Sequence, residues 1–300
     1  MSRAKQKDGK PAAGHLVIIG GAEDREGDKP ILTRVVELAQ RPDPTVIVLT
    51  AASAQPEEMW ATYDQAFGDL GVGRRVWFDL SAREAANDPQ VAQAILDADV
   101  VFMTGGDQKR LLSVVGGTPV DCALQAGVRE RGLCVAGTSA GASAMSDYMP
   151  ATASNEPLPS RDMVTLAAGL GLLQRVVIDQ HFSERQRLGR LLSVIAQNPA
   201  LLGVGIDEDT ALVIAPGSSI EVIGEGAVTV ADGSRMRCNF LEVKRREALQ
   251  LENVALHLLP SGTRLERPPL TEQEGAVGMA SLAGLAKAVS MLTTMPALAR

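Results

Sequence analysis

The chain has 300 residues, of which 45% are hydrophobic and 3% aromatic, and its formal net charge is -7. This apolar content is enough to bury a core of ordinary size, and the negative charge argues against a general nucleic-acid-binding protein, which would carry a basic surface to attract phosphate. Its three cysteines, Cys122, Cys134 and Cys238, have no CxxC spacing, so neither a disulfide framework nor a zinc site is expected. This cysteine pattern favours a cytoplasmic protein.

The two ends of the chain differ from the middle in composition. Residues 1–14 are polar and lack the apolar run of a secretory signal, which predicts a disordered leader. Residues 276–299 are small and apolar with a single charge, at Lys287, and are long enough to raise the question of a membrane span. Glycine, proline and few large aliphatic side chains weaken that interpretation. We expect residues 268–300 to form a helix on the body or on a partner subunit, and residues 15–267 to form one α/β domain.

Residues 16–139 repeat one pattern, in which a short apolar run rich in β-branched residues is followed by a turn and a segment with helical periodicity. The apolar runs are 16–21, 45–53, 76–80, 100–106 and 134–139. Helical segments are expected near 29–39, 56–70, 89–97, 108–115 and 119–131. This alternation is typical of a parallel sheet covered by helices.

The second half begins with a further strand at 175–181 and a helix over about 184–197. Alternating strands then follow in 203–214, 219–233 and 252–260, and we expect them to be antiparallel and to cover the end of the sheet. The predicted fold class is therefore α/β, a doubly wound, mostly parallel sheet flanked by helices, with a C-terminal antiparallel β extension. In such sheets ligands bind outside the carboxyl ends of the strands.

The sequence Gly-Thr-Ser-Ala-Gly at 137–141 follows a buried strand and precedes a segment of small residues. This is the strand, turn and helix context in which a G-x-S-x-G match predicts a nucleophilic serine, here Ser139. The glycines permit a tight turn that exposes the hydroxyl at a helix N-terminus, and the N–H of Ala140 would then donate to an oxyanion. The alternative is that small residues at this turn only permit close packing.

A serine nucleophile needs a base, and the chain has only three histidines. His15 lies at the amino end of the first strand, and His257 lies in an apolar run of the late antiparallel part. His181 ends the strand at 175–181, which would bring it to the same edge of the sheet as Ser139. We therefore predict His181 as the base, with a structural, hydrogen-bonded histidine as the alternative.

The imidazole in turn needs an acidic partner. Glu208, just after an apolar run, is the first candidate, and Asp207, Asp209 and Glu156 are rivals. The three consecutive carboxylates could also form a solvated turn or bind substrate, and the sequence leaves this choice open.

A glycine pair at 105–106 ends the strand at 100–106. It allows a backbone N–H to point into the site, so Gly106 is the expected second oxyanion donor. Phosphate binding is the competing interpretation for a glycine pair before a helix. Neither this segment nor Gly-Gly-Ala-Glu-Asp-Arg at 20–25 has the spacing of a P-loop or of GxGxxG, which disfavours a nucleotide site.

The order Ser, His, Glu differs from the Ser, acid, His order of α/β-hydrolases. Together with GGAEDR, TGGDQ, GTSAGA, DQHFSER, GIDEDTA and LPSGTR, this order resembles the cyanophycinases of peptidase family S51, relatives of aspartyl dipeptidase on a fold akin to class I glutamine amidotransferases. The similarity runs from about residue 16 to residue 264, and DQHFSER is its most specific element.

The resemblance implies a serine-type exopeptidase that cuts cyanophycin, a polyaspartate whose side chains carry arginine, into β-Asp-Arg dipeptides. It implies a Ser139, His181 and Glu208 triad, no cofactor or metal, and a homodimer. It also implies the substrate-pocket residues Gln108, Asp179, Gln180, Arg185 and Arg190. A substrate with guanidinium and carboxylate groups calls for both acids and bidentate cations.

Two other functions stay open. One is a dipeptidase for short aspartyl or isoaspartyl peptides, which would share the triad. The other, of a different class, is a catalytically silent polymer-binding protein. No nucleic-acid or membrane partner is expected.

Overall fold

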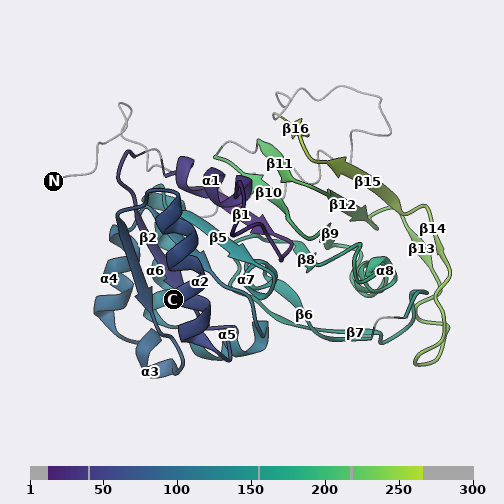
Figure 1. Ribbon diagram of the computed structural model, residues 1–300. Helices are drawn as coiled ribbons and strands as arrows, with labels where there is room; N and C mark the ends of the chain where they lie inside the picture. Colours follow the sequence, from purple (N-terminus) through teal and green to yellow (C-terminus); the bar gives the residue numbers. More distant parts are fainter. Residues whose placement is uncertain (1–12, 40, 155, 217–218, 266–300) are drawn as a thin grey trace.

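The computed structural model describes residues 13–265 except 40, 155 and 217–218, and the described residues form a mixed α/β fold around a large, mostly parallel sheet (Figure 1). Within them, this central sheet has eight strands in the order β16-β11-β10-β1-β5-β4-β2-β3. Its parallel strands are β1 (Leu16–Ile19), β2 (Thr45–Leu49), β3 (Arg74–Phe78), β4 (Val100–Met103) and β5 (Cys134–Thr138). Its antiparallel strands are β10 (Thr210–Ile214), β11 (Ile220–Gly224) and β16 (Arg264–Leu265). The five strands expected in the first half are confirmed.

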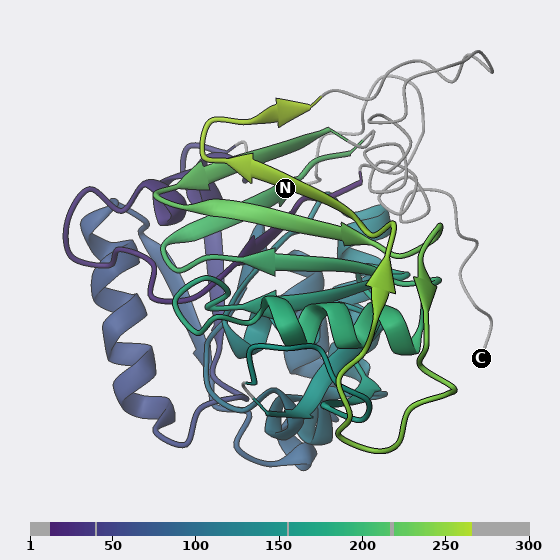
Figure 2. The same cartoon turned by 90° about the vertical axis from the view of Figure 1, so that its right-hand side faces the viewer.

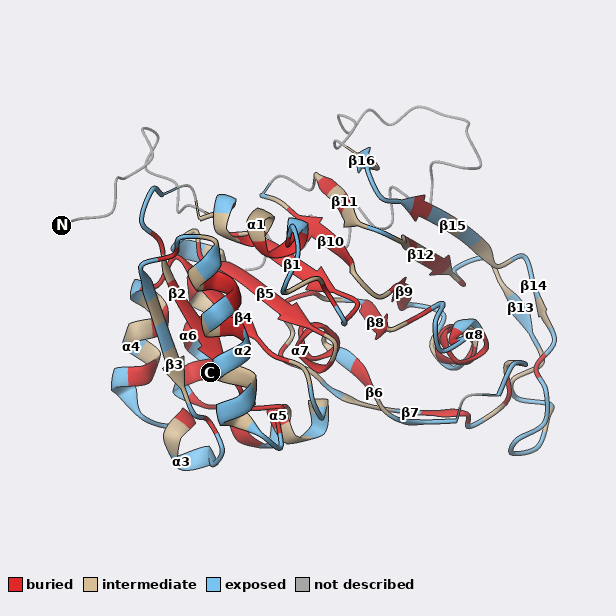
Figure 3. Cartoon of the chain, viewed as in Figure 1, coloured by how far each residue is buried: buried red, intermediate tan, exposed pale blue. Residues whose placement is uncertain are grey.

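Helices cover both faces of the central sheet. Along β1, Val17 and Ile19 pack with α1 and α2, whereas Leu16 and Ile18 pack with the helices of the opposite face. The helices of this half are α1 (Pro30–Glu37), α2 (Pro56–Asp69), α3 (Arg83–Ala86), α4 (Pro89–Asp97), α5 (Gln108–Val115) and α6 (Pro119–Glu130). Figure 3 shows the strands buried between the helices, whose outer faces are exposed.

The helix boundaries follow local chemistry. Asp88, Asp107 and Thr118 are the N-caps of α4, α5 and α6, and each side chain accepts a hydrogen bond from a backbone N–H of the first turn. Proline occupies the first turn of α1, α2, α4 and α6, where its missing N–H costs nothing. The five expected helices of this half are confirmed, whereas the short α3 was not predicted.

A second sheet lies beside the central one. It has four strands in the order β15-β12-β9-β8, within the described residues, and α8 packs against it (Figure 2). Its elements are β8 (Val176–Gln180), β9 (Leu202–Ile206), β12 (Ala227–Asp232), β15 (Ala255–Pro260) and α8 (Leu188–Gln197). The strand predicted at 175–181 therefore exists, but it pairs with β9 and does not extend the central sheet. Apolar patterning sets a strand's existence, but its partner depends on distant segments.

Six further elements differ from expectation. The helix after Ser139, α7 (Ala140–Ala144), is only five residues long. The hairpin β6 (Tyr148–Ala153) with β7 (Val164–Ala168), and the pair β13 (Arg237–Cys238) with β14 (Leu251–Glu252), were not predicted. Helix α8 begins at Leu188, four residues after the expected start, because residues 182–187 form turns.

The predicted extension at 268–300, with its apolar stretch at 276–299, lies outside the described residues, and so does nearly all of the predicted leader at 1–14. Within the described part of the chain, no single helix is both long and apolar enough to cross a membrane. Helices α5 and α6 pass such a test only as a pair, with a bend of 97° between them.

Replacing Phe102 by alanine is expected to lower the free energy of unfolding by about 3–5 kcal/mol, because the ring is fully buried and a cavity would remain. Its ring lies 4.5 Å from that of Tyr63 and 5.5 Å from that of Phe67, between centroids. Urea unfolding measures the change. The exposed Leu241→Ala is the control and should change little; equal losses in both variants would contradict the predicted core.

Candidate active site

The site forms where the two sheets meet. Strands β1, β4 and β5 end at one edge of the central sheet, and β10, which is antiparallel to β1, begins there. Strands β8 and β9 of the second sheet end against the same edge: His181 N–H donates to Gly20 O at 2.8 Å, and Asp209 N–H donates to Gly21 O at 2.8 Å. The short connection from β9 to β10 thus joins the sheets at the site.

Ser139 stands on a sharp turn between β5 and α7. Its φ of 51° and ψ of -108° lie outside the usual regions for a non-glycine residue, and its N–H donates to Ile19 O at 3.0 Å. The flanking Gly141 is required by packing, because a Cβ there would lie 2.4 Å from Met103 O. The local geometry is that of a nucleophile elbow.

His181 lies between Ser139 and Glu208. Its Nε2 is 3.0 Å from Ser139 Oγ, and its Nδ1 is 2.5 Å from Glu208 Oε1. His181 and Asp209 also have positive φ, 47° and 43°. Residues in such sparsely populated conformations persist only where the surrounding structure holds them in place, and they cluster at functional sites.

The rival acids are occupied elsewhere. The Asp207 carboxylate accepts hydrogen bonds from Ser183 and from Ala227 N–H, and Asp209 Oδ1 accepts one from Asp24 N–H. Glu156 is exposed. Of the four candidates, all of them described, Glu208 is the one whose carboxylate contacts His181.

Burial lowers the pKa of His181 below the ordinary value for histidine, and the positive charges of Arg185 and Arg187 act in the same direction. The hydrogen bond and the charge of Glu208 oppose this shift. The imidazole is therefore neutral at pH 7, as a base requires. The arrangement can move a proton from Ser139 Oγ to His181 Nε2, with Glu208 stabilising the resulting cation.

Glu208→Gln is expected to lower kcat by roughly 10²–10⁴-fold, because the amide can neither stabilise the imidazolium nor fix its tautomer. Since Glu208 raises the pKa of His181, its removal should also move the acidic limb of the kcat/KM profile to lower pH. The matched control is Glu156→Gln at the exposed rival acid. An unshifted limb with an unchanged rate in Glu208→Gln would contradict the role of Glu208.

The glycine pair after β4 lies against Ser139. A Cβ on Gly105 would be 3.4 Å from Ser139 Cβ, and one on Gly106, whose φ is 140°, would be 2.1 Å from Ala52 O. Only glycine fits this second position. Ala140 is the first residue of α7, so its N–H has no acceptor within the helix.

The five residues expected in a substrate pocket are not equivalent in the structure. Arg185 is exposed, and its positive charge lies close enough to His181 to lower the pKa of the imidazole. Gln108 is partly buried, and its Nε2 donates to Pro150 O at 2.7 Å. Asp179, Gln180 and Arg190 are buried instead.

The buried residues form one polar cluster with Arg187, which the sequence-based prediction left out. Arg190 donates to both oxygens of Asp179, and Arg187 donates to Gln180 Oε1 at 2.7 Å and to Asp179 Oδ1 at 3.4 Å. Asp179 is 1% exposed, so its carboxylate faces these arginines and not an open surface. Burial lowers the pKa of Arg187 to about 10. The position of Arg187, six residues after His181 in a turn, was the signal that could have found it.

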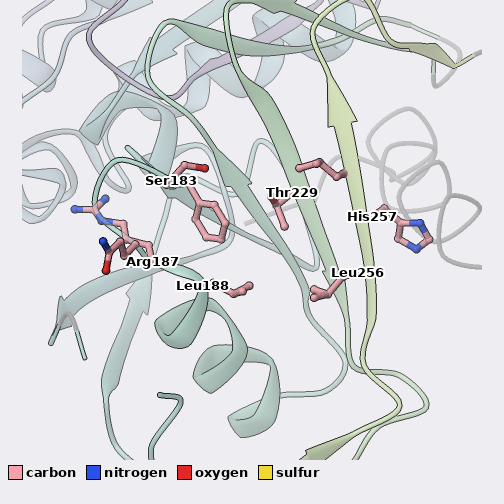
Figure 4. A pocket seen from close by; sticks show the side chains of 9 residues that line it. Ser183, Arg187, Leu188, Thr229, Leu256 and His257 are labelled. Atoms are coloured by element: carbon pink, nitrogen blue, oxygen red, sulfur yellow. The ribbon is translucent and has the colours of Figure 1, made fainter. Parts of the chain in front are cut away.

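A pocket of about 340 Å³ lies between the turn at 182–188 and strands β12 and β15. Its wall is mainly apolar, and Figure 4 shows the Arg187 guanidinium directed away from Thr229 and Leu256. Ser139, His181 and Glu208 do not line it. Among the described residues, no group of three or more His, Cys, Asp or Glu side chains could hold a metal ion.

Comparison with known proteins gives one family. The model of Peptidase family S51 matches residues 16–223. The chain is 36% identical to the cyanophycinase of Geminocystis herdmanii, over 87% of this chain and 97% of the relative, and 37% identical to that of Trichormus variabilis, over 83% and 84%. The crystal structure of a peptidase from an acI-B1 Actinobacterium shares the fold, with a TM-score of 0.62 and 20% identity over 85% of this chain and 97% of that one. The chain therefore belongs to peptidase family S51.

Proposed function

We propose that this peptidase hydrolyses cyanophycin to β-Asp-Arg dipeptides through an acyl-enzyme on Ser139. The observation that carries the proposal is the continuous hydrogen-bonded series from Ser139 Oγ through His181 to Glu208, at 3.0 and 2.5 Å. The substrate follows from relatives that carry the name cyanophycinase and align along most of their length.

In the proposed mechanism, Ser139 Oγ attacks the carbonyl carbon of an aspartyl bond while His181 Nε2 takes the hydroxyl proton. The N–H groups of Gly106 and Ala140 hold the oxyanion. Collapse of the tetrahedral intermediate breaks the C–N bond, and the leaving amine takes the proton from His181. A water molecule, deprotonated by the same histidine, then hydrolyses the ester and restores Ser139.

We propose two tiers of substrate recognition. Arg185, exposed beside His181, would bind a carboxylate of the substrate. Gln108, the first residue of α5, would form a hydrogen bond with the substrate through its side-chain amide. Asp179, Gln180 and Arg190 are buried and would act indirectly, because Asp179 and Gln180 accept hydrogen bonds from Arg187 and Arg190 donates to Asp179. This arrangement keeps the Arg187 guanidinium oriented before the substrate arrives.

The test uses the purified full chain with insoluble cyanophycin, and in parallel with Asp-X and isoaspartyl dipeptides. Clearing of the suspension with release of β-Asp-Arg, identified by mass spectrometry, is the expected result. Cleavage of dipeptides without attack on the polymer would overturn the proposed substrate in favour of a dipeptidase. Binding of the polymer with no hydrolysis of either would favour a silent binding protein.

We further propose a cytoplasmic homodimer. Cys122, Cys134 and Cys238, all within described segments, are free thiols, which suits a reducing compartment. The homodimer rests on the family resemblance, and light scattering after size-exclusion chromatography tests it.

A further inference from the structure

The segment from Ile19 to Asp24 begins at the last residue of β1 and contacts the parts of the chain that carry all three residues of the proposed triad. Ile19 O accepts from Ser139 N–H at 3.0 Å, and Gly20 O accepts from His181 N–H at 2.8 Å. Asp24 N–H donates to Asp209 Oδ1 at 2.9 Å, next to Glu208. The position of this one segment is therefore coupled to the position of the whole site.

Glu23 is the buried charged residue of this segment, with 2% exposure. Thr138, directly before the nucleophile, donates from Oγ1 to Glu23 Oε2 at 2.5 Å, and the Tyr63 hydroxyl donates to Glu23 Oε1. Thr138 and Tyr63 are themselves 2% and 1% exposed. Burial of a carboxylate costs free energy of solvation unless hydrogen bonds replace those to water. Both oxygens of Glu23 accept such a bond, one from each of two buried side chains.

The Tyr63 side of the contact is packed in the core. The ring packs against Phe67 and Phe102 between α2 and the central sheet. Burial raises the pKa of Tyr63 well above the ordinary value, and the charge of Glu23 adds to this, so the hydroxyl stays protonated and remains a donor. Glu23 thereby links a fixed point in the core to the residue before Ser139.

We propose that Glu23 is a positioning residue of the peptidase: by accepting hydrogen bonds from Tyr63 and Thr138, it fixes the strained turn at Ser139 and the segment that supports His181. This inference rests on the proposed role of Ser139 as nucleophile, and not on cyanophycin as substrate. Glu23 lies behind the turn and does not touch the reacting atoms. Its loss should therefore slow the attack of Ser139 without weakening the binding of substrate.

The experiment measures the rate at which a fluorophosphonate labels Ser139, together with kcat and KM on whichever peptide is cleaved. Thr138→Val removes the hydroxyl and keeps the shape, whereas Thr138→Ser keeps the hydroxyl and removes a methyl group. We expect Glu23→Gln and Thr138→Val to reduce labelling and kcat by roughly 10–100-fold with KM within about twofold, since small misplacements of reacting groups cost rates of this order. Thr138→Ser should retain most of the rate.

Double substitution sharpens the test. If Glu23 acts through Thr138, then Glu23→Gln combined with Thr138→Val should cost little more than either change alone. Additive losses, a larger loss in Thr138→Ser than in Thr138→Val, or unchanged labelling in folded Glu23→Gln would overturn the inference. Labelling without cleavage of cyanophycin would overturn only the proposed substrate, and no labelling of the unaltered protein would overturn both.

Discussion

Ser139→Ala is expected to lower kcat/KM by at least about 10⁴-fold and to abolish covalent labelling by a fluorophosphonate, because removing the nucleophile of a triad leaves only binding and oxyanion stabilisation. The effect should fall on chemistry and not on folding. Alanine removes a single oxygen atom, and the hydrogen bond from the backbone N–H of residue 139 to Ile19 O remains. A thermal unfolding curve close to that of the unaltered protein would establish this.

The control for this variant is Ser113→Ala. Ser113 is exposed, and its hydroxyl donates only to Arg110 O in its own helix, at 2.8 Å. It should leave rate and labelling unchanged. Retention of activity in Ser139→Ala, or labelling at another serine in it, would show that the nucleophile lies elsewhere.

Gly21→Ala is expected to reduce kcat/KM by about 10²-fold or more, because the added methyl group would clash with the His181 imidazole. A Cβ on Gly21 would lie 2.4 Å from His181 Cε1 and 2.5 Å from Nε2. The Gly21 carbonyl accepts a hydrogen bond from Asp209 N–H, which restrains the backbone, so the ring has to shift and its 3.0 Å contact with Ser139 Oγ would be disturbed. A displacement of about 1 Å is enough to cost this much in rate. Kinetics and fluorophosphonate labelling measure it.

Gly71→Ala provides a matched control. Gly71 also has a positive φ, 78° against 106° for Gly21, but a Cβ there would meet nothing within 4 Å. Both substitutions should cost about 1–2 kcal/mol of folding free energy through backbone strain. Only Gly21→Ala should lose activity, and equal activity of the two variants would contradict the close approach of Gly21 to the His181 ring.

The site residues were predictable to different degrees. Ser139 has a local signature, since glycines, a preceding strand and a following helix are all visible in the sequence. His181 was predicted as the base because the chain has only two other histidines, and one of them, His15, lies at the amino end of β1, away from the site. Glu208 could not be separated from Asp207 and Asp209, because alternation along a turn does not determine which of three neighbouring carboxylates faces a residue 27 positions away.

The buried polar cluster around Arg187 was the least predictable part. Asp179, Gln180 and Arg190 were expected to face the substrate, but the structure buries them around Arg187. The sequence does not indicate whether these charged residues pair with one another or with a ligand, because that depends on how β8 and α8 pack against each other. Glu23 was likewise visible only as part of a glycine-containing segment without a nucleotide-binding pattern.

The sequence by itself determined the parallel half of the central sheet and its covering helices, since apolar runs, prolines and caps are local signals with a fixed periodicity. It also contains the G-x-S-x-G motif around Ser139 that predicts a nucleophile. Only the tertiary structure decided that β8 and β9 form a second sheet, and that the β9 to β10 connection brings Glu208 to His181 at the junction of the two sheets. The physical reason is that strand pairing joins segments far apart in the chain through backbone hydrogen bonds, which are nearly the same for every residue and leave little trace in the sequence.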